Sequence, residues 1–283
     1  DEYAHWLRIF YETVKQADAR AIVSLGSLRS PGLRLPGQAG DYPVYLERLL
    51  ASPSLSGPGF PYFDVVSFHS FPDSHPGRRP FDESLAYIQQ ILAARGLTRP
   101  VWLTEFGCDA RIGETEQAAR LVAWSLRAKA IGIERAYIYC LWDYHWTTPD
   151  RPSEFFGLIR EAGDALERKT AFTSVATLLK ELASRPEVTR RDENVYALEG
   201  EGPITYAIWQ EAGTPRELQF LTSDWWEVRT LAGHTMKRQG PQVPLTPMPI
   251  FVQKAASPFL GESPFMFNPM APPSKKDEDK NRS

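Results

Sequence analysis

Cysteine is scarce in this sequence, and long apolar runs are missing from it. The 283 residues include two cysteines, Cys108 and Cys140, which are too few for a disulfide scaffold and leave the redox compartment open. We expect two buried free thiols, with a bridge between them as the alternative. No apolar stretch approaches the roughly 18 residues that a membrane-spanning helix needs, so we expect no membrane partner.

A surplus of one charge is also missing. The chain has 32 Lys and Arg against 35 Asp and Glu, a formal net charge of −3, whereas nucleic-acid binders normally carry a basic surplus. The five histidines and two cysteines show no metal-ligand spacing. The sequence contains neither a glycine-rich phosphate loop nor a Gly-x-Ser-x-Gly elbow. It therefore predicts no nucleic-acid partner, no metal and no cofactor.

The chain opens on Asp1, with neither a Met nor a signal-peptide pattern. Residues 1–18 already predict an amphipathic helix, because their apolar side chains recur at a spacing close to 3.6 residues. A chain that begins inside a helix leads us to expect a preceding segment. This start leaves localisation open, secretion and cell-surface display included.

Strand patterns and helix patterns alternate over the first two thirds of the chain. Buried strands are predicted at 21–25, 61–71, 99–107 and 134–144. Helices are predicted at 1–18, 44–50, 81–96, 114–132 and 170–185. This alternation is typical of a parallel sheet with helical crossovers. The long loops after the strands suit a (β/α)8 barrel, which places its active site there, but a doubly wound sheet shows the same alternation.

The composition changes after about residue 187. Short strand-like runs separated by Gly, Pro and charged turns indicate a small antiparallel β-sandwich-like domain over residues 188–255. The last segment, 256–283, contains Pro and Met and ends in a charged run, so we expect a disordered tail. The predicted domains are thus 1–187, 188–255 and 256–283.

Polar and aromatic side chains follow the last three predicted strands of the first domain. His69 ends the second strand, Glu105 the third, and Trp142 with Asp143 the fourth. In a parallel barrel these strand ends converge on one mouth. Glu105 is the sharpest candidate, because a carboxylate directly after an apolar strand is costly to bury unless it is paired or functional. A structural pairing with an Arg, or an exposed position at the rim, is the alternative interpretation.

These residues resemble the large clan of retaining glycoside hydrolases that have (β/α)8 barrels. The Thr-Glu-Phe-Gly sequence around Glu105, His69 in its Phe-His-Ser context and Trp142 match strands seven, six and eight of that clan. The resemblance implies that residues 1–187 are strands five to eight of a half TIM barrel. It also implies that Glu105 is the catalytic nucleophile, that His69 lines the subsite of the cleaved sugar, and that Trp142 is a platform for that sugar.

The chemistry of the clan fits the residue types in the sequence. Retaining hydrolysis of an oligo- or polysaccharide uses two carboxylates about 5 to 5.5 Å apart, one as nucleophile and one as acid/base. Indole rings stack on the apolar faces of sugars. We add Trp146 and Asp143 as candidates for sugar binding, with a loop position for Trp146 and a loop cap or rim charge for Asp143 as the alternatives.

The sequence departs from the clan in two places. The acid/base Glu of the clan follows an Asn at the end of strand four, and no Asn-Glu-Pro occurs in this chain. We therefore expect the acid/base before Asp1, in a missing N-terminal half-barrel or on a partner chain, and expect this chain to be an incomplete glycosidase. Many members also have a Tyr two residues after the His, where this chain has Phe71. Tyr144 or another residue is expected to take that role.

Two other functions are compatible with the sequence. One is a non-catalytic carbohydrate-binding protein on a degenerate barrel, which an intact Glu105 argues against. The other is an unrelated enzyme with a doubly wound sheet, which would give His69, Glu105 and Trp142 no common mouth. The sugar and the linkage are left open by the sequence.

Overall fold

The computed structural model describes residues 2–29, 42–71, 81–145, 154–210, 216–220, 225–239, 242–254 and 265–269. The chain divides into two compact units, residues 1–169 and residues 170–283. Each unit is described by itself below. The helix predicted at 170–185 thus belongs to the second unit, and the predicted domain boundary near residue 187 stays a prediction.

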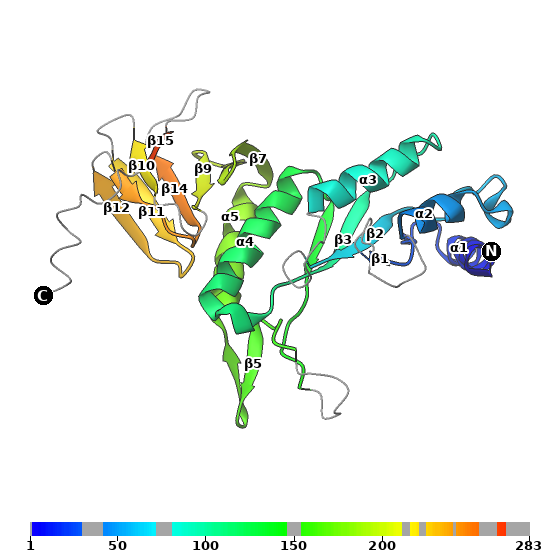
Figure 1. The fold of residues 1–283 in the computed structure, drawn as a ribbon, viewed down its shortest axis with the longest axis horizontal. Helices are drawn as coiled ribbons and strands as arrows, with labels where there is room; N and C mark the ends of the chain where they lie inside the picture. Colours follow the sequence, from blue (N-terminus) through cyan, green and yellow to red (C-terminus); the bar gives the residue numbers. More distant parts are fainter. Residues whose placement is uncertain are drawn as a thin grey trace, which may run out of the picture. The chain divides into compact units, whose positions relative to one another are not determined.

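The first unit is built on a four-stranded parallel sheet whose strands are adjacent in chain order (Figure 1). Its strands are β1 (Leu28–Arg29), β2 (Val66–Ser70), β3 (Val101–Phe106) and β4 (Arg135–Ile138). The helices α1 (Glu2–Ala17), α2 (Tyr42–Leu50), α3 (Phe81–Ala93) and α4 (Glu114–Ala130) precede and connect them. This is the predicted alternation of strand and crossover helix. Closure of the sheet into a barrel stays a prediction.

The first predicted strand, 21–25, is wrong in its position. Only an isolated bridge joins Ser24 to Val65, and the regular pairing with β2 begins at Leu28. The Leu25 N–H donates to the Val65 carbonyl at 2.9 Å, while Ser67 Oγ donates a hydrogen bond to the carbonyl oxygen of Leu25 at 2.7 Å. Side-chain bonds of this kind compete with the backbone ladder. Ser27 Oγ also lies 2.9 Å from Ser67 Oγ, which keeps this segment beside β2 without a regular ladder.

The core of the first unit lies between the sheet and its helices. Phe106 on β3 packs edge-to-face on Phe81 of α3, with ring centroids 5.9 Å apart. Leu121, Val122 and Leu126 of α4 are fully buried. Full burial of an aliphatic side chain contributes about 1.5–3 kcal/mol, so these residues fix the helices against the strands. The strand ends that carry the predicted site are thereby held in place.

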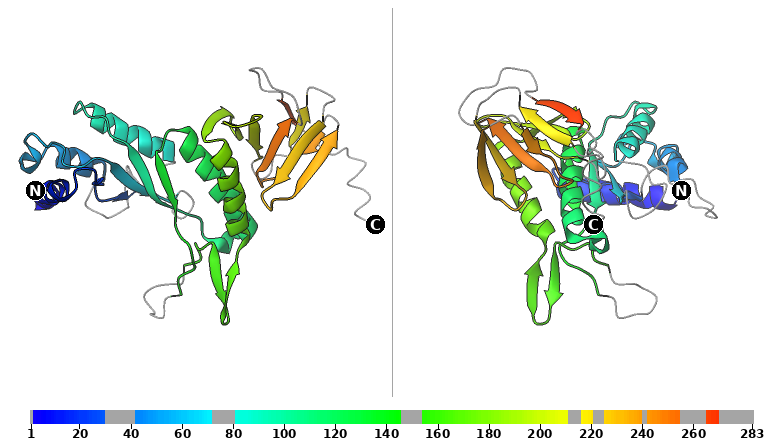
Figure 2. Two further views of the ribbon diagram at one scale, coloured as in Figure 1. Left: turned by 180° about the vertical axis from the view of Figure 1, so that it is seen from behind. Right: turned by 60° about the vertical axis from the view of Figure 1, so that its left-hand side comes forward.

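A hairpin that the sequence did not predict follows β4. Strands β5 (Ile159–Ala162) and β6 (Ala165–Arg168) pair antiparallel and form a two-stranded sheet of their own (Figure 2). Gly163 in its turn has φ 62°, a left-handed conformation that glycine adopts without steric cost. The two arms are only four residues each, with charged residues in the middle of one and at the end of the other, so no alternation of apolar and polar residues revealed them.

In its described residues, the second unit combines one helix with antiparallel sheets (Figure 2). The helix is α5 (Thr170–Ser184). A six-stranded sheet has the order β12-β11-β14-β9-β8-β7, and a three-stranded sheet has the order β13-β10-β15. The bounds are β7 (Glu187–Asp192), β8 (Val195–Glu199), β9 (Thr205–Ile208), β10 (Arg216–Phe220), β11 (Trp225–Thr230), β12 (Thr235–Gln239), β13 (Gln242–Pro244), β14 (Ile250–Lys254) and β15 (Phe265–Pro269).

The core of the second unit collects inward-facing residues of its strands. Trp226, Ile208 and Val252 are fully buried within one apolar cluster. Helix α5 is tied to the sheet by Thr177, whose hydroxyl donates to the carbonyl of Leu231 at 3.1 Å. The segment from 256 onward, for which the sequence predicts disorder, includes β15, which pairs with β10. Across the described residues of both units, no helix is long and apolar enough to cross a membrane.

Candidate active site

Glu105 and His69 face each other across neighbouring strands. They are paired in the register of β2 and β3, and Glu105 Oε2 lies 3.1 Å from His69 Nδ1. Their side chains keep 36% and 28% of their accessible surface, respectively. The carboxylate is therefore held by a partner and still reaches solvent, as a nucleophile that must meet a ligand requires. Among the described residues, the ion-pair partner of this carboxylate is the histidine, not an Arg.

An irregularity in the sheet creates this pairing. The register shifts between Phe68 and His69, so Leu103 pairs with Phe68 but Glu105 pairs with His69, and Thr104 is left over. Thr104 is the extra residue, and its hydroxyl donates a hydrogen bond to the Phe68 carbonyl at 3.2 Å. Bulges of this kind re-aim side chains beside active sites. Here the shift brings Glu105 opposite His69, where regular pairing would have put Thr104.

Trp142 follows the end of β4 and is 46% exposed. Its backbone is bridged to Ile159 at the start of the hairpin. An indole this open is available to a ligand and does not belong to the core. Its orientation toward Glu105, and with it the sugar-platform role, stays a prediction.

An aromatic cluster lies beside these strand ends. Tyr139, directly after β4, donates its backbone N–H to the Phe106 carbonyl at 2.8 Å, next to Glu105. Its ring contacts Phe71 at 5.7 Å and Phe156 at 5.8 Å between centroids, and stacks on Tyr144 at 6.2 Å. Phe71 thus packs edge-to-face against Tyr139 as part of this cluster. Tyr144 stacks on Tyr139, and its expected role as a partner of the nucleophile stays a prediction.

A second carboxylate joins this cluster. Tyr139 donates its hydroxyl to Glu154 Oε2 at 2.9 Å. Burial and then the nearby Glu154 carboxylate raise the pKa of Tyr139 well above its ordinary value, so the phenol stays protonated and acts as a donor. Sequence analysis missed both residues. Glu154 follows no predicted strand, and only its fold-back onto Tyr144, with backbone bonds of 2.8 and 2.9 Å, brings it here.

Both cysteines are free and buried, as expected. Burial first, and then the Asp143, Glu154 and Glu105 carboxylates, raise the pKa of the Cys140 thiol to about 12. The Cys140 thiol donates weakly to the Trp142 carbonyl at 3.1 Å. This thiol is therefore a packed, protonated group beside the site.

Asp143 is placed differently from its predicted role. Its carboxylate is 3% exposed and lies 2.6 Å from Nζ of Lys169, which is 2% exposed. Asp143 Oδ1 also accepts the backbone N–H of Gly157 at 2.8 Å. A buried carboxylate that is charge-paired and hydrogen-bonded within the protein is already satisfied, so this geometry favours the alternative of a loop cap over sugar binding.

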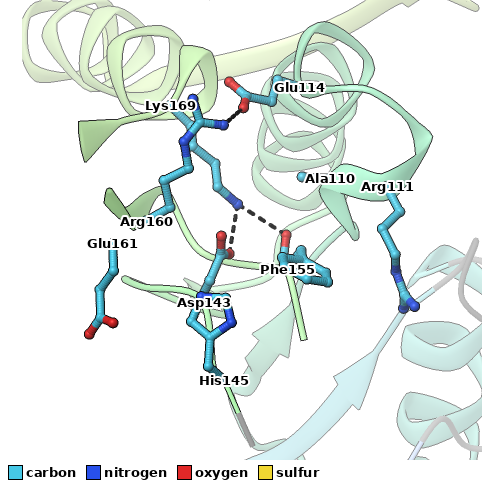
Figure 3. Close-up of a pocket in the computed structure, with 9 residues that line it drawn as sticks. All are labelled: Ala110, Arg111, Glu114, Asp143, His145, Phe155, Arg160, Glu161 and Lys169. Carbon is cyan, nitrogen blue, oxygen red and sulfur yellow. Dashed lines mark hydrogen bonds and ion pairs between the residues drawn. The ribbon is translucent and has the colours of Figure 1, made fainter. Parts of the chain in front are cut away.

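A cavity of about 260 Å³ adjoins this ion pair (Figure 3). It opens between the start of α4, the segment after β4 and the β5–β6 hairpin, and the Asp143–Lys169 pair is part of its lining. Arg160 in its wall contacts Glu114 and also bonds Glu167. Within the described parts of the chain, no group of three or more His, Cys, Asp or Glu could hold a metal. Trp146 lies outside the described residues.

Comparison with known proteins gives structural likeness without close sequence likeness. No family model and no curated protein matches the sequence. Among solved structures, a family 39 glycoside hydrolase from Bacteroides cellulosilyticus WH2 is 18% identical with a TM-score of 0.67, over 89% of this chain and 55% of that one. A β-porphyranase of glycoside hydrolase family 86 from Bacteroides plebeius is 13% identical with a TM-score of 0.55, over 91% and 53%.

A glucosidase from Croceicoccus marinus is also 13% identical with a TM-score of 0.55, over 89% of this chain and 64% of that one. This chain therefore spans between half and two thirds of the length of these structures. At such identities the likeness establishes the fold. The chain has a glycoside hydrolase fold, with a parallel α/β part and a separate antiparallel part.

Proposed function

We propose that this chain provides the nucleophile side of a retaining glycoside hydrolase site that acts on an oligo- or polysaccharide. The observation that carries the proposal is the pair of Glu105 and His69, 3.1 Å apart at the ends of adjacent parallel strands. The fold shared with glycoside hydrolases supports it. The known activities of those proteins belong to chains longer than this one.

In this mechanism Glu105 attacks the anomeric carbon and forms a covalent glycosyl-enzyme, which water then hydrolyses. His69 donates a hydrogen bond to the carboxylate and fixes its orientation, so the attacking oxygen meets the sugar in one geometry. Trp142 and Trp146 stack on the apolar faces of sugar rings in this proposal. No cofactor or metal takes part in the proposed reaction.

The second carboxylate of the reaction is the acid/base that protonates the leaving oxygen. We propose that it comes from a further segment or a partner chain, in line with the half-barrel expected from the sequence. Glu154 is the competing candidate within the described residues, because Glu154 and Glu105 both raise the pKa of the Cys140 thiol, which lies near both carboxylates. Its Oε2 already accepts the Tyr139 hydroxyl at 2.9 Å, so this oxygen is engaged within the protein and Glu154 is the weaker candidate.

The test is covalent labelling, first of this chain and then of any longer product of its gene. We would incubate each protein with 2-deoxy-2-fluoro glycosides that carry a dinitrophenolate leaving group, in several sugar configurations. Such substrates need no general acid, so labelling reports on the nucleophile alone. Peptide mass spectrometry should place the label on Glu105, and Glu105→Gln should remove it.

Glu154→Gln is the matched control, since it neutralises the other carboxylate near Cys140 and should leave labelling intact. A label on another residue, or turnover of Glu105→Gln within tenfold of the wild type, would refute the assignment. Sugar binding by calorimetry without labelling would favour a non-catalytic carbohydrate-binding protein.

A further inference from the structure

The buried ion pair of Asp143 and Lys169 stands out among the charged groups of the first unit. Both side chains are at least 97% buried, and Nζ lies 2.6 Å from Oδ1 (Figure 3). Charges removed from water in this way are costly unless they are paired and hydrogen-bonded. The other ion pairs among the described residues of the first unit lie between more accessible side chains, so surface solubility does not account for this pair.

Each partner of the pair holds a different stretch of backbone. Asp143 accepts the N–H of Gly157 at 2.8 Å. Lys169 Nζ donates to the Phe155 carbonyl at 3.2 Å, and the backbone N–H of Lys169 donates to the Leu158 carbonyl at 2.9 Å. Three segments separated in sequence are therefore joined at one point, namely the residues around Asp143, residues 155–158 and the end of the hairpin.

Close packing of the backbone makes this joint intolerant of displacement. A Cβ at Gly157 would lie 2.3 Å from the Asp143 nitrogen and 2.3 Å from the carbonyl carbon of Trp142, so only glycine fits. Gln117, buried on α4, donates from Nε2 to the carbonyls of Phe155 at 3.3 Å and Gly157 at 3.4 Å. The segment 155–157 is thus fastened from two sides.

The fastened segments adjoin two residues of the candidate site, the exposed Trp142 and the half-buried Glu154. Trp142 precedes Asp143 directly, and Glu154 precedes Phe155, whose carbonyl both Lys169 and Gln117 hold. The ion pair itself faces inward. The pair would therefore affect a bound ligand only through the position of the residues that it holds.

The adjoining cavity shown in Figure 3 does not suggest that the pair binds an anion. Its three cationic side chains already face carboxylates, so their charge is compensated before any anion arrives. The pairs are Arg111 with Asp109, Arg160 with Glu114, and Lys169 with Asp143.

We propose that Asp143 and Lys169 are positioning residues, which hold Trp142 and the segment carrying Glu154 in the geometry that receives the sugar. This inference rests on the proposed function for its account of the sugar, but its structural part can be tested without any substrate. Neither residue touches the reacting atoms. The pair fixes the wall of the site through backbone contacts.

The first experiment follows Trp142 by fluorine NMR in protein labelled with 5-fluorotryptophan. Trp142→Phe assigns the Trp142 resonance, and Trp226, fully buried in the second unit, supplies a reference resonance in the same spectrum. Asp143→Asn is nearly isosteric, and Lys169→Met removes the ammonium. We expect both to shift or broaden the Trp142 resonance and to leave the Trp226 resonance in place.

Glu181→Gln is the matched control, because Glu181 is also 3% exposed and bonds Arg185 and Arg229 within the second unit. It should lower stability without moving the Trp142 resonance. The double variant Asp143→Asn with Lys169→Met leaves no lone buried charge and should fold better than Lys169→Met alone. We still expect a displaced Trp142 resonance in it, because the bond to the Phe155 carbonyl is gone.

The second experiment measures binding of a sugar that the wild type binds. We expect at least fivefold weaker binding for Asp143→Asn and for the double variant, and binding within twofold of the wild type for Glu181→Gln. An unshifted Trp142 resonance in folded Asp143→Asn and double-variant protein would overturn the inference. If Glu105 resists labelling while the resonance moves, the positioning role holds and the proposed function fails.

Discussion

Glu105 lies opposite His69 because the pairing of β2 with β3 skips Thr104. The result is a contact of 3.1 Å between Oε2 and Nδ1, in which both side chains stay partly exposed. Hydrogen bonds to charged groups contribute about 1.5–3 kcal/mol. The contact is therefore strong enough to orient a nucleophile and is open to a direct test.

The first prediction concerns His69→Ala. We expect kcat/KM to fall by about tenfold to hundredfold, as the loss of one polar contact that orients the nucleophile implies. The measurement is steady-state hydrolysis of a dinitrophenyl glycoside that has its 2-hydroxyl and the sugar configuration of the fluoro glycoside that labels the wild type. His234→Ala, which changes an exposed histidine of the second unit, should leave the rate unchanged. Equal rates for His69→Ala and wild type would mean that the histidine does not support the reaction.

A second prediction separates binding from packing at Trp142. Because its indole is 46% exposed, Trp142→Ala should weaken sugar binding and turnover while leaving the melting temperature close to that of the wild type. Trp226→Ala is the contrast, since removing a fully buried aromatic costs about 3–5 kcal/mol. Calorimetry and kinetics on both variants decide the matter. A large loss of stability with unchanged kinetics for Trp142→Ala would assign the indole to packing.

The third prediction concerns the bond from Tyr139 to Glu154. Tyr139→Phe keeps the ring contacts, and Glu154→Gln keeps the shape of the acceptor. The two effects on unfolding free energy should not add, and a double-mutant cycle should give a coupling of about 1 kcal/mol. Urea unfolding of the four proteins, followed by tyrosine fluorescence and circular dichroism, measures it. Strictly additive effects would show that the bond contributes nothing to the fold.

The fourth prediction is a pH dependence that comes from Cys140. Its pKa in the folded protein is raised to about 12, against roughly 8.5 for a free thiol. The folded state therefore holds this proton more tightly than the unfolded state. The resulting stability is fully present below the unfolded pKa and is lost as pH rises from about 8.5 toward the folded value.

Two measurements check this expectation. Iodoacetamide at pH 8.5 should alkylate Cys140 far more slowly in the folded chain than in urea, because the thiolate is the reactive form. Cys140→Ala should also flatten the fall in stability between pH 8 and pH 10 relative to the wild type. Rapid alkylation of Cys140 in the folded chain would contradict a buried, protonated thiol.

The sequence by itself determined the features that local pattern encodes. Alternating apolar strands and amphipathic helices predicted the parallel α/β part and the β-rich part, because periodicity follows from which face of each element is buried. Glu105 and His69 could be selected for a related reason. A polar side chain at the end of an apolar strand is visible without any knowledge of its partners.

The tertiary structure decided everything that depends on residues far apart in the chain. Asp143 looked like a rim carboxylate until Lys169, 26 residues later, placed a buried ammonium against it. Tyr139 and Glu154 meet because the chain folds back beyond the strand end, and no spacing rule marks either residue. The offset at Thr104 arises from hydrogen bonds between strands. Local pattern carries burial, but charge pairing and register are properties of contacts, and contacts exist only once the chain has folded.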